Sequence, residues 1–274
     1  MTLMKVLPRS AVSTVVGRLT RAPLPAWAHH SVIRRFARHY RVNLEEAQGA
    51  IEDFSNFGEF FTRKLKPGLR TIAPGDKVVA SPVDGAISQI GVVNGGKCVQ
   101  AKGIDFPVDK LLGDTDLARA YDGGAFATLY LSPRDYHRIH APLAGTITGY
   151  SYLPGEFWPV NPASVRNVDA LFAVNERLVT YLATPLGKVA VVAVGATCVS
   201  RIHPSYVDLL THQGQSAQSH TFEQPIAVEK GGELGMFEMG STVILVFEKG
   251  RMTWDPGFGP DAPVKLGQRL GEGA

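Results

Sequence analysis

The sequence contains few cysteines and no long apolar run. Its two cysteines, Cys98 and Cys198, do not form a CxxC pair, which argues against a disulfide framework or a cysteine-rich zinc site. No stretch reaches the roughly 18 consecutive apolar residues of a membrane-spanning helix. The 274 residues are 45% hydrophobic, which is enough for a substantial core. These features predict an ordinary folded protein that does not cross a bilayer.

Acidic residues are absent from the chain before Glu45. The same stretch carries eight basic residues, so the formal net charge of +3 divides into +8 for this arm and −5 for the remainder (3 − 8 = −5). The positive charge is therefore concentrated at one end of an otherwise acidic chain. We expect no nucleic-acid partner.

The basic arm has the pattern of amphipathic helices. Arginines share residues 32–41 with an apolar face, and a second mixture of apolar and basic residues spans 12–24. Such helices bind anionic membranes, where each Lys or Arg contributes about 1 kcal/mol. A helix that packs on the protein's own core and a mitochondrial presequence are the alternatives. We predict that residues 1–60 form the membrane-docking region. The apolar face of the helix within residues 32–41 would consist of Val32, Ile33, Phe36, Ala37 and Tyr40.

From about Ala80 onward, short β-rich runs alternate with Gly and Pro. We predict an α+β fold with a predominantly antiparallel, barrel-sandwich-like catalytic body over 61–274, and further helices at 43–54 and 170–173. Residues 81–87 and 140–147 resemble each other, since in each a proline, a short bend and a glycine precede a strand. The predicted strands are 86–90, 126–131, 145–152, 178–184, 188–194 and 242–247.

Gly240 and Ser241 directly precede the last of these strands. If Ser241 Oγ attacks the Gly240 carbonyl, the amide becomes an ester, and β-elimination then breaks the chain. Hydrolysis of the resulting dehydroalanine releases ammonia and leaves a pyruvoyl group at position 241. Glycine suits position 240 because it lacks a Cβ that would hinder the attack. Most Gly-Ser pairs are only turns, so this signal gains weight from other residues.

Three further residues could serve this chemistry. His137 and His140 follow a predicted strand, and metal binding, structural hydrogen bonding and acid-base catalysis are the competing roles for them. Asp84 lies in an Asp-Gly pair, which is commonly a turn, but its carboxylate could instead orient an imidazole. Asp84, His140 and Ser241 would then supply an orienting group, a base and a nucleophile.

Separated motifs occur at 57–63, 81–85, 131–140, 174–177 and 235–242. Together they resemble the phosphatidylserine decarboxylases, especially their bacterial membrane-bound branch. The likeness runs from about residue 30 to the end, with Met239 replacing the family's usual leucine before Gly-Ser.

The resemblance implies that Asp84, His140 and Ser241 form a self-processing triad. Cleavage between Gly240 and Ser241 would give a β chain (1–240) and an α chain (241–274), with a covalent pyruvoyl group as cofactor and Schiff-base site. That group would remove the carboxylate of phosphatidylserine, leaving phosphatidylethanolamine and CO2. We expect His137 to donate the proton, and Phe157 and Arg177 to contact substrate.

The same resemblance predicts a peripheral protein on the cytoplasmic face of the bacterial cell membrane. Its partners would be phosphatidylserine in an anionic membrane and its own cleaved half, as an α/β heterodimer or a higher oligomer. We expect no metal. The alternatives are a Ser-His-Asp hydrolase acting on a lipid ester and a noncatalytic membrane-docked β-module. Deletion of residues 1–41 is expected to abolish most vesicle binding and to leave self-cleavage intact.

Overall fold

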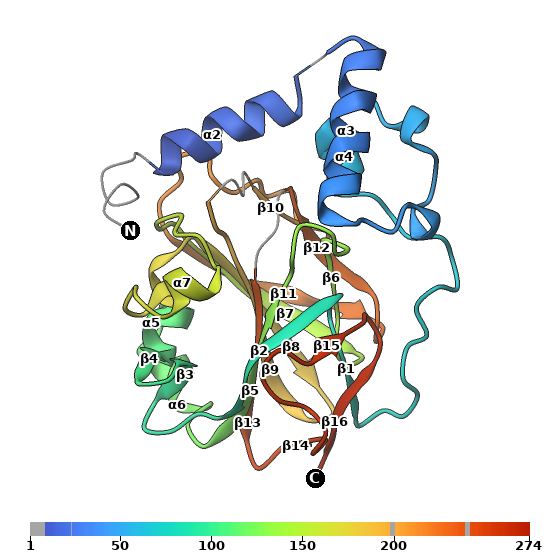
Figure 1. The fold of residues 1–274 in the computed structure, drawn as a ribbon. Helices are drawn as coiled ribbons and strands as arrows, with labels where there is room; N and C mark the ends of the chain where they lie inside the picture. Colours follow the sequence, from blue (N-terminus) through green and yellow to red (C-terminus); the bar gives the residue numbers. More distant parts are fainter. Residues whose placement is uncertain (1–8, 23, 198–200, 239–241) are drawn as a thin grey trace.

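The computed structural model of the protein describes residues 9–22, 24–197, 201–238 and 242–274. A helical N-terminal part lies at one end of a β-rich body (Figure 1). The helices and 3-10 turns are α2 (Arg9–Thr20), α3 (Ala26–Tyr40), η1 (Leu44–Glu46), η2 (Ile51–Asp53), α4 (Phe57–Phe61), α5 (Val108–Leu112), α6 (Thr115–Arg119), α7 (Pro162–Val165) and α8 (Leu171–Val174).

The body is built around an eight-stranded antiparallel sheet with the order β11-β7-β8-β9-β13-β5-β2-β15. All six predicted strands belong to this sheet, as β2 (Gly85–Val92), β5 (Gly124–Tyr130), β7 (Gly145–Leu153), β8 (Arg177–Thr184), β9 (Gly187–Val194) and β13 (Thr242–Lys249). Its edges are β11 (Gln218–Val228) and β15 (Pro263–Val264). The α+β prediction is therefore confirmed, although the sheet is open and does not close into a barrel.

Three smaller sheets complete the described body. They have the orders β1-β16-β14, β10-β12-β6 and β3-β4. Their strands are β1 (Val78–Ala80), β3 (Lys97–Ala101), β4 (Ile104–Pro107), β6 (Arg138–His140), β10 (Ile202–Pro204), β12 (Glu233–Phe237), β14 (Met252–Trp254) and β16 (Arg269–Gly273).

Strand β13 lies in the middle of the large sheet and is buried on both faces. Val243 and Leu245 pack into the core cluster on one face, while Ile244 and Val246 pack into the cluster on the other. A strand buried in this way needs a continuous apolar run, because successive side chains point to opposite faces. The position explains why residues 243–247 show no polar alternation.

The two similar segments lie side by side. The His140 amide donates to the Pro82 carbonyl at 2.9 Å, and the Ala80 amide donates to the Pro142 carbonyl at 3.0 Å. Each repeat contains a glycine, at the start of its strand, that packs directly against a neighbouring strand. A Cβ at Gly85 would lie 2.3 Å from the Tyr130 carbonyl oxygen, and a Cβ at Gly145 would lie 2.2 Å from that of Ala183. The sequence similarity therefore reflects two equivalent turns.

The helix predicted over 43–54 is wrong, and that on 170–173 is confirmed as α8. Two short 3-10 turns, η1 and η2, take the place of the longer helix. Gly49 between them has φ +100°, and Ala47 forms an isolated bridge to Leu65. Both features interrupt an α-helix, since its residues keep negative φ and bond within the helix.

The apolar face proposed for the arm is largely internal. Ile33 and Ala37 of α3 are buried in a cluster with Val42 and Phe60, and Phe36 packs beside them. These three residues therefore cannot form a membrane-facing surface while α3 stays packed. The alternative of packing on the protein's own core is correct for this face, and other residues of the helices remain exposed.

Candidate active site

The segment with the expected cleavage site joins two well-placed strands. Gly240 and Ser241 themselves, like Cys198, lie outside the described residues. The chain reaches them after Glu238, whose amide donates to the Arg201 carbonyl, and leaves them at Thr242. Thr242 begins β13 and pairs with Tyr130 of β5 and Val194 of β9. Thr242, the residue that follows Ser241 in the chain, is therefore held in place by strands on both sides.

His140 is held in a tautomer that can accept a proton at Nε2. Its Nδ1 donates to the Gly231 carbonyl at 2.8 Å, and its Nε2 is 3.2 Å from the Tyr136 hydroxyl, which donates to it. Burial lowers the pKa of His140, partly opposed by the hydrogen bond to Gly231. The imidazole is therefore neutral near pH 7, as a general base requires.

His137 is fully buried beneath the ring of Phe61, with ring centroids 4.2 Å apart. Its Nδ1 donates to the Asp135 carbonyl at 2.8 Å, while Nε2 has no hydrogen-bond partner among the described residues. Burial lowers the pKa of His137 to about 3. The imidazole is thus a neutral group with an available lone pair at Nε2, and it must first gain a proton before it can donate one there.

Asp84 is buried, and none of its described hydrogen bonds is to the His140 ring. It accepts from Arg70 Nε at 3.0 Å and Nη2 at 2.6 Å, and from the Leu266 amide at 2.8 Å. Lys265 Nζ is 3.2 Å away. Burial alone would raise the pKa of Asp84, but these donors and charges outweigh it and lower the pKa. Asp84 thus joins the segment before β2 to the C-terminal segment.

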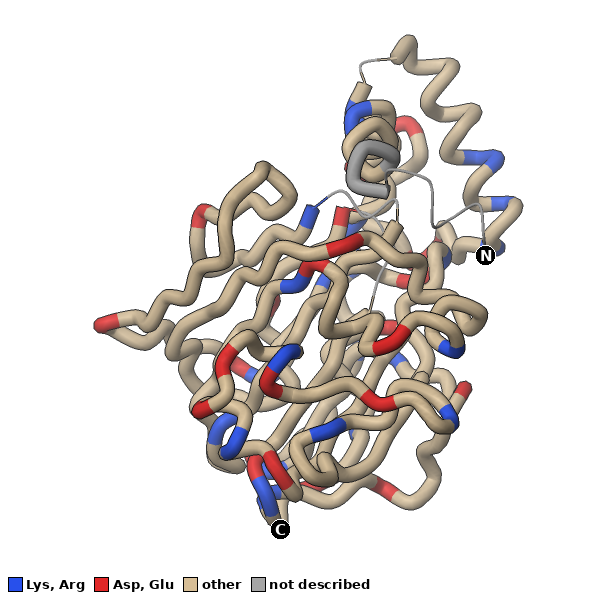
Figure 2. The backbone as a smooth tube through the Cα atoms, turned by 90° about the vertical axis from the view of Figure 1, so that its left-hand side faces the viewer, with Lys and Arg blue, Asp and Glu red and all other residues tan. Residues whose placement is uncertain are grey.

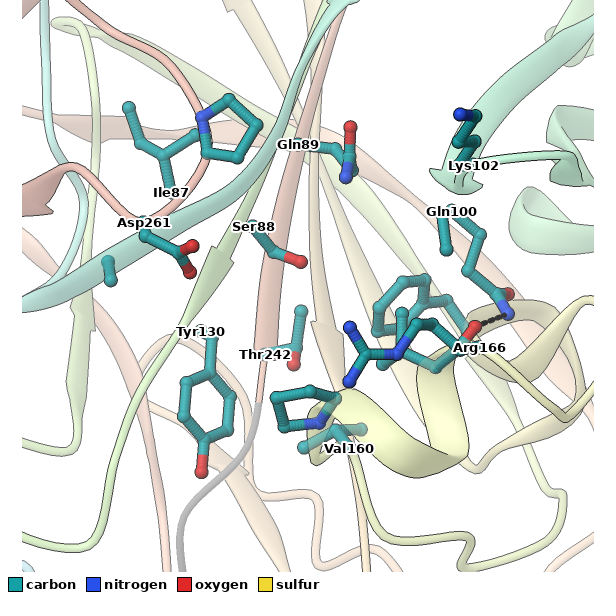
Figure 3. A pocket seen from close by; sticks show the side chains of 16 residues that line it. Ile87, Ser88, Gln89, Gln100, Lys102, Tyr130, Val160, Arg166, Thr242 and Asp261 are labelled. Atoms are coloured by element: carbon teal, nitrogen blue, oxygen red, sulfur yellow. Dashed lines mark hydrogen bonds between the residues drawn. The ribbon is translucent and has the colours of Figure 1, made fainter.

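A cavity of about 280 Å³ adjoins the start of β13, and Thr242 lies in its wall (Figure 3). β2 and β3 line another side, and α7 with the residues after it lines the third. Arg166 and Lys102 are its cationic lining residues and Asp261 its acidic one, beside the neutral polar side chains of Ser88, Gln89 and Gln100. The sequence analysis did not single out any of these six.

The two residues predicted to contact substrate are both buried. Arg177 donates to the carbonyls of Lys110, Leu111 and Asn175, and burial lowers its pKa to about 10. The Phe157 ring packs edge-on against His212 at 4.5 Å. These contacts favour structural roles, and substrate contact remains a prediction that they do not support.

The segment 57–63 packs against residues 134–137, which lead to the two histidines. The sequence analysis did not predict this contact. Phe61 covers His137, and Arg63 Nη2 donates to the carbonyls of Arg134 at 3.0 Å and Asp135 at 3.3 Å. The Asp135 carbonyl is also the one that fixes His137 Nδ1. The aromatic residues of this segment, FGEFFTR, were visible in the sequence. An aromatic cluster alone, however, does not indicate which residue it will cover in the fold.

The part of the chain that the structure describes contains no group of three His, Cys, Asp or Glu residues arranged to hold a metal ion. None of its helices combines the length and the apolar character needed to span a membrane.

Comparisons with known proteins agree on one family. Residues 57–272 match the model of the phosphatidylserine decarboxylase family. The chain is 60% identical over 271 residues to the phosphatidylserine decarboxylase proenzyme of Myxococcus xanthus, covering 99% of this chain and 97% of that protein. It is 54% identical to the proenzyme of Anaeromyxobacter sp. strain K, with 99% and 97% covered, and 43% identical to that of Brevibacillus brevis, with 96% and 94% covered. The chain therefore belongs to the phosphatidylserine decarboxylase family.

Proposed function

We propose that the protein decarboxylates phosphatidylserine to phosphatidylethanolamine, after cutting its own chain between Gly240 and Ser241. The observation that carries this proposal is the position of Thr242. This residue directly follows Ser241, is fixed between two strands, and lies in the wall of a cavity with cationic residues at its edge. Family membership supports the substrate, and the relatives' description as proenzymes supports the cut.

In the cleavage step, His140 Nε2 would take the hydroxyl proton of Ser241. The Gly231 carbonyl fixes the required tautomer, since Nδ1–H is committed to it. Tyr136 would have to yield its hydrogen bond to Nε2 as Ser241 approaches. The orienting role of Asp84 would act at longer range or in another arrangement of the loop, because its described partners are Arg70, Lys265 and Leu266.

The described surroundings fit a pyruvoyl group at position 241, because the cavity leaves room for a substrate beside Thr242. Such a group supplies an electron sink for the bond pair left when CO2 departs. His137 Nε2 would accept the proton that the substrate ammonium must lose before it reacts, and would return that proton to the substrate carbon. This order of steps starts from the neutral imidazole that burial favours, and it would give the expected proton donor its proton.

The helices at the top of Figure 1 would dock the protein on an anionic membrane at the cytoplasmic face. Large apolar side chains on α2 and α3 are exposed, with Leu19 64% and Trp27 74% accessible. Basic residues lie along the same helices (Figure 2). Apolar insertion and attraction to anionic lipids then act together. Exposed arginines among the described residues of the two helices are Arg18 of α2 and Arg34, Arg35 and Arg38 of α3.

Mass spectrometry and a lipid assay together test the proposal. The purified protein should consist of two associated chains, 1–240 and 241–274, as an α/β heterodimer. The smaller chain should be lighter by one ammonia than the same peptide with an N-terminal serine. Incubation with phosphatidylserine vesicles should release CO2 and phosphatidylethanolamine. An active protein with an intact chain and an unmodified Ser241 would contradict the pyruvoyl mechanism. Hydrolysis of a lipid ester by such a protein would favour the hydrolase, and absence of any activity would favour the noncatalytic module.

A further inference from the structure

We propose that Arg166 and Lys102 bind the phosphodiester of the substrate head group in the cavity beside Thr242. This inference rests on the proposed function, and it adds a site for one chemical group of the substrate. Three properties of the cavity carry it: its size, the state of its charged side chains, and its position beside Thr242.

The cavity suits a polar head group. Its volume of about 280 Å³ leaves room for a phosphate with its serine, and its mouth is open. Two acyl chains are much longer than this head group. The acyl chains must therefore leave through the cavity mouth, and the charged group must stay inside or at its edge.

The cationic side chains of the cavity are available for a ligand. Arg166 and Lys102 are both exposed, and across the described ranges neither side chain forms an ion pair or hydrogen bond. Arg166 points across the cavity toward Thr242, while Lys102 stands at another edge (Figure 3). A guanidinium can bind two phosphate oxygens at once, and an ammonium adds a more mobile point charge.

A buried side chain holds the segment that carries Arg166. Gln100 is fully buried, and its Nε2 donates to the carbonyls of Val165 and Val168, each at 2.8 Å. These carbonyls lie on either side of Arg166 in the chain. Gln100 Oε1 is buried and has no described hydrogen-bond partner. Gln100 is thus a positioning residue for Arg166.

The reaction determines which anionic group should meet the cations. The substrate's amine-bearing carbon must come within reach of residue 241, and its phosphate follows after one methylene and one oxygen. A cation bound to the carboxylate would stabilise the starting state and slow the loss of CO2. A cation bound to the phosphate holds the substrate throughout the reaction. The carboxylate can then face apolar lining residues such as Ile87 and Phe172.

Substitution of the two cations tests the subsite. In Arg166→Gln and Lys102→Gln, self-cleavage should proceed, while kcat/KM for phosphatidylserine should fall roughly 10- to 100-fold for the loss of a charge-assisted hydrogen bond. Arg166→Lys should restore part of the loss. Arg119→Gln is the matched control, since Arg119 is exposed and lies on α6 outside this cavity. Equal activity of Arg166→Gln, Lys102→Gln and the control would overturn the proposal.

Methylation of the substrate phosphate provides the second arm. The uncharged phosphotriester of phosphatidylserine should be a poor substrate for the unsubstituted protein, with a much smaller further loss in Arg166→Gln. A full additional loss would place the phosphate elsewhere. If the unsubstituted protein neither cleaves nor decarboxylates, the proposed function fails instead, so the two failures are distinguishable.

A binding measurement does not depend on cleavage or activity. In the uncut Ser241→Ala protein, glycerophosphoserine should bind at the cavity, and Arg166→Gln should weaken the binding roughly 10-fold or more. Isothermal titration calorimetry measures both dissociation constants. Equal binding in the two proteins would exclude Arg166 from the subsite, even if its substitution impaired cleavage.

Discussion

Arg21, which directly follows α2, forms an ion pair with Glu238, the described residue just before the expected cleavage segment. Glu238 Oε1 also lies 2.8 Å from His203 Nε2, and Arg201 is 3.9 Å away. A second contact joins Thr14 of α2 to His212 at 2.9 Å. The N-terminal arm therefore touches the part of the body from which the cleavage segment extends.

The first prediction concerns this ion pair. Arg21→Ala should slow self-cleavage several-fold, because Glu238 loses a partner that fixes the upstream end of the segment. The fraction of cut chain is followed by denaturing electrophoresis after synthesis in a cell-free system. Arg18→Ala is the control, since Arg18 is exposed near the end of α2, three residues before Arg21, and has no described contact of this kind.

The same contact changes the expectation for arm deletion. The sequence alone predicts that removal of residues 1–41 spares self-cleavage, whereas the structure leads us to expect slower cleavage together with weaker vesicle binding. Full cleavage at the normal rate in the deletion protein would show that the Arg21–Glu238 pair has no role in processing.

The second prediction separates the two histidines. His140→Ala should leave the chain uncut, since loss of a general base costs roughly 10²- to 10⁴-fold in rate. His137→Ala should still cut, at least in part, and then decarboxylate poorly. Electrophoresis reports the first step and CO2 release the second. The assignment would be reversed if His140→Ala cut normally and His137→Ala did not.

The third prediction is a pH profile for self-cleavage. His140 acts in its neutral form, and burial lowers its pKa below the ordinary value of 6.5. The cleavage rate should therefore stay constant as pH falls from 8 to about 6.5, and should decline only below that value. Rates are measured on freshly translated protein in a series of buffers. A decline centred above pH 7 would exclude a depressed His140 pKa as the controlling group.

The fourth prediction links His137 to acid stability. Its pKa is about 3 in the folded protein against 6.5 for the ordinary side chain, so the unfolded chain binds the proton more tightly. The contribution of His137 to the free energy of unfolding is therefore fully present above about pH 6.5. Below that value the free energy of unfolding falls by at most about 1.4 kcal/mol per pH unit, down to about pH 3.

Urea unfolding of the uncut Ser241→Ala protein at pH 7 and pH 5 measures this effect. His137→Asn in that background should lose less stability between the two values. His39→Asn serves as the control, because His39 is exposed on α3. An unchanged pH dependence in His137→Asn would rule out His137 as the source.

The fifth prediction tests what Asp84 does. Arg70→Gln removes two hydrogen bonds from the buried Asp84 carboxylate without altering His140, and should destabilise the uncut protein by about 3 kcal/mol. If Asp84 orients His140, Asp84→Asn should block cleavage while Arg70→Gln still cuts. If both variants fold and cut normally, Asp84 does not orient His140, and self-cleavage does not depend on the Asp84–Arg70 hydrogen bonds.

The repeated strand pattern allowed much of the body to be predicted from sequence. The six strands of the large sheet follow from short apolar runs bounded by Gly and Pro, and β13 from its continuous run after Thr242. The helix over 43–54 failed because local propensity does not reveal the positive φ of Gly49. The inward face of α3 was identified as apolar, but periodicity cannot tell whether lipid or Phe60 covers it.

The candidate site was only partly accessible to the same reasoning. Histidines, an aspartate and a Gly-Ser pair carry recognisable chemistry, so their residue types drew attention. The Gly231 carbonyl that orients His140 carries no signal, since every residue has such a group. Arg166 and Lys102 looked like ordinary surface charges, because only the folded chain brings them to the cavity beside Thr242.

The central place of β13 has a consequence for the order of events during biosynthesis. The strand pairs with β9 on one side and β5 on the other, so it must be inserted between them while the sheet assembles. An unbroken chain delivers this strand at high effective concentration, whereas a separate peptide 241–274 would have to find the gap by diffusion. If the chain is cut at the proposed position, folding must therefore precede the cut. Cut protein that has been fully denatured should then refold poorly, whereas the uncut Ser241→Ala chain should refold.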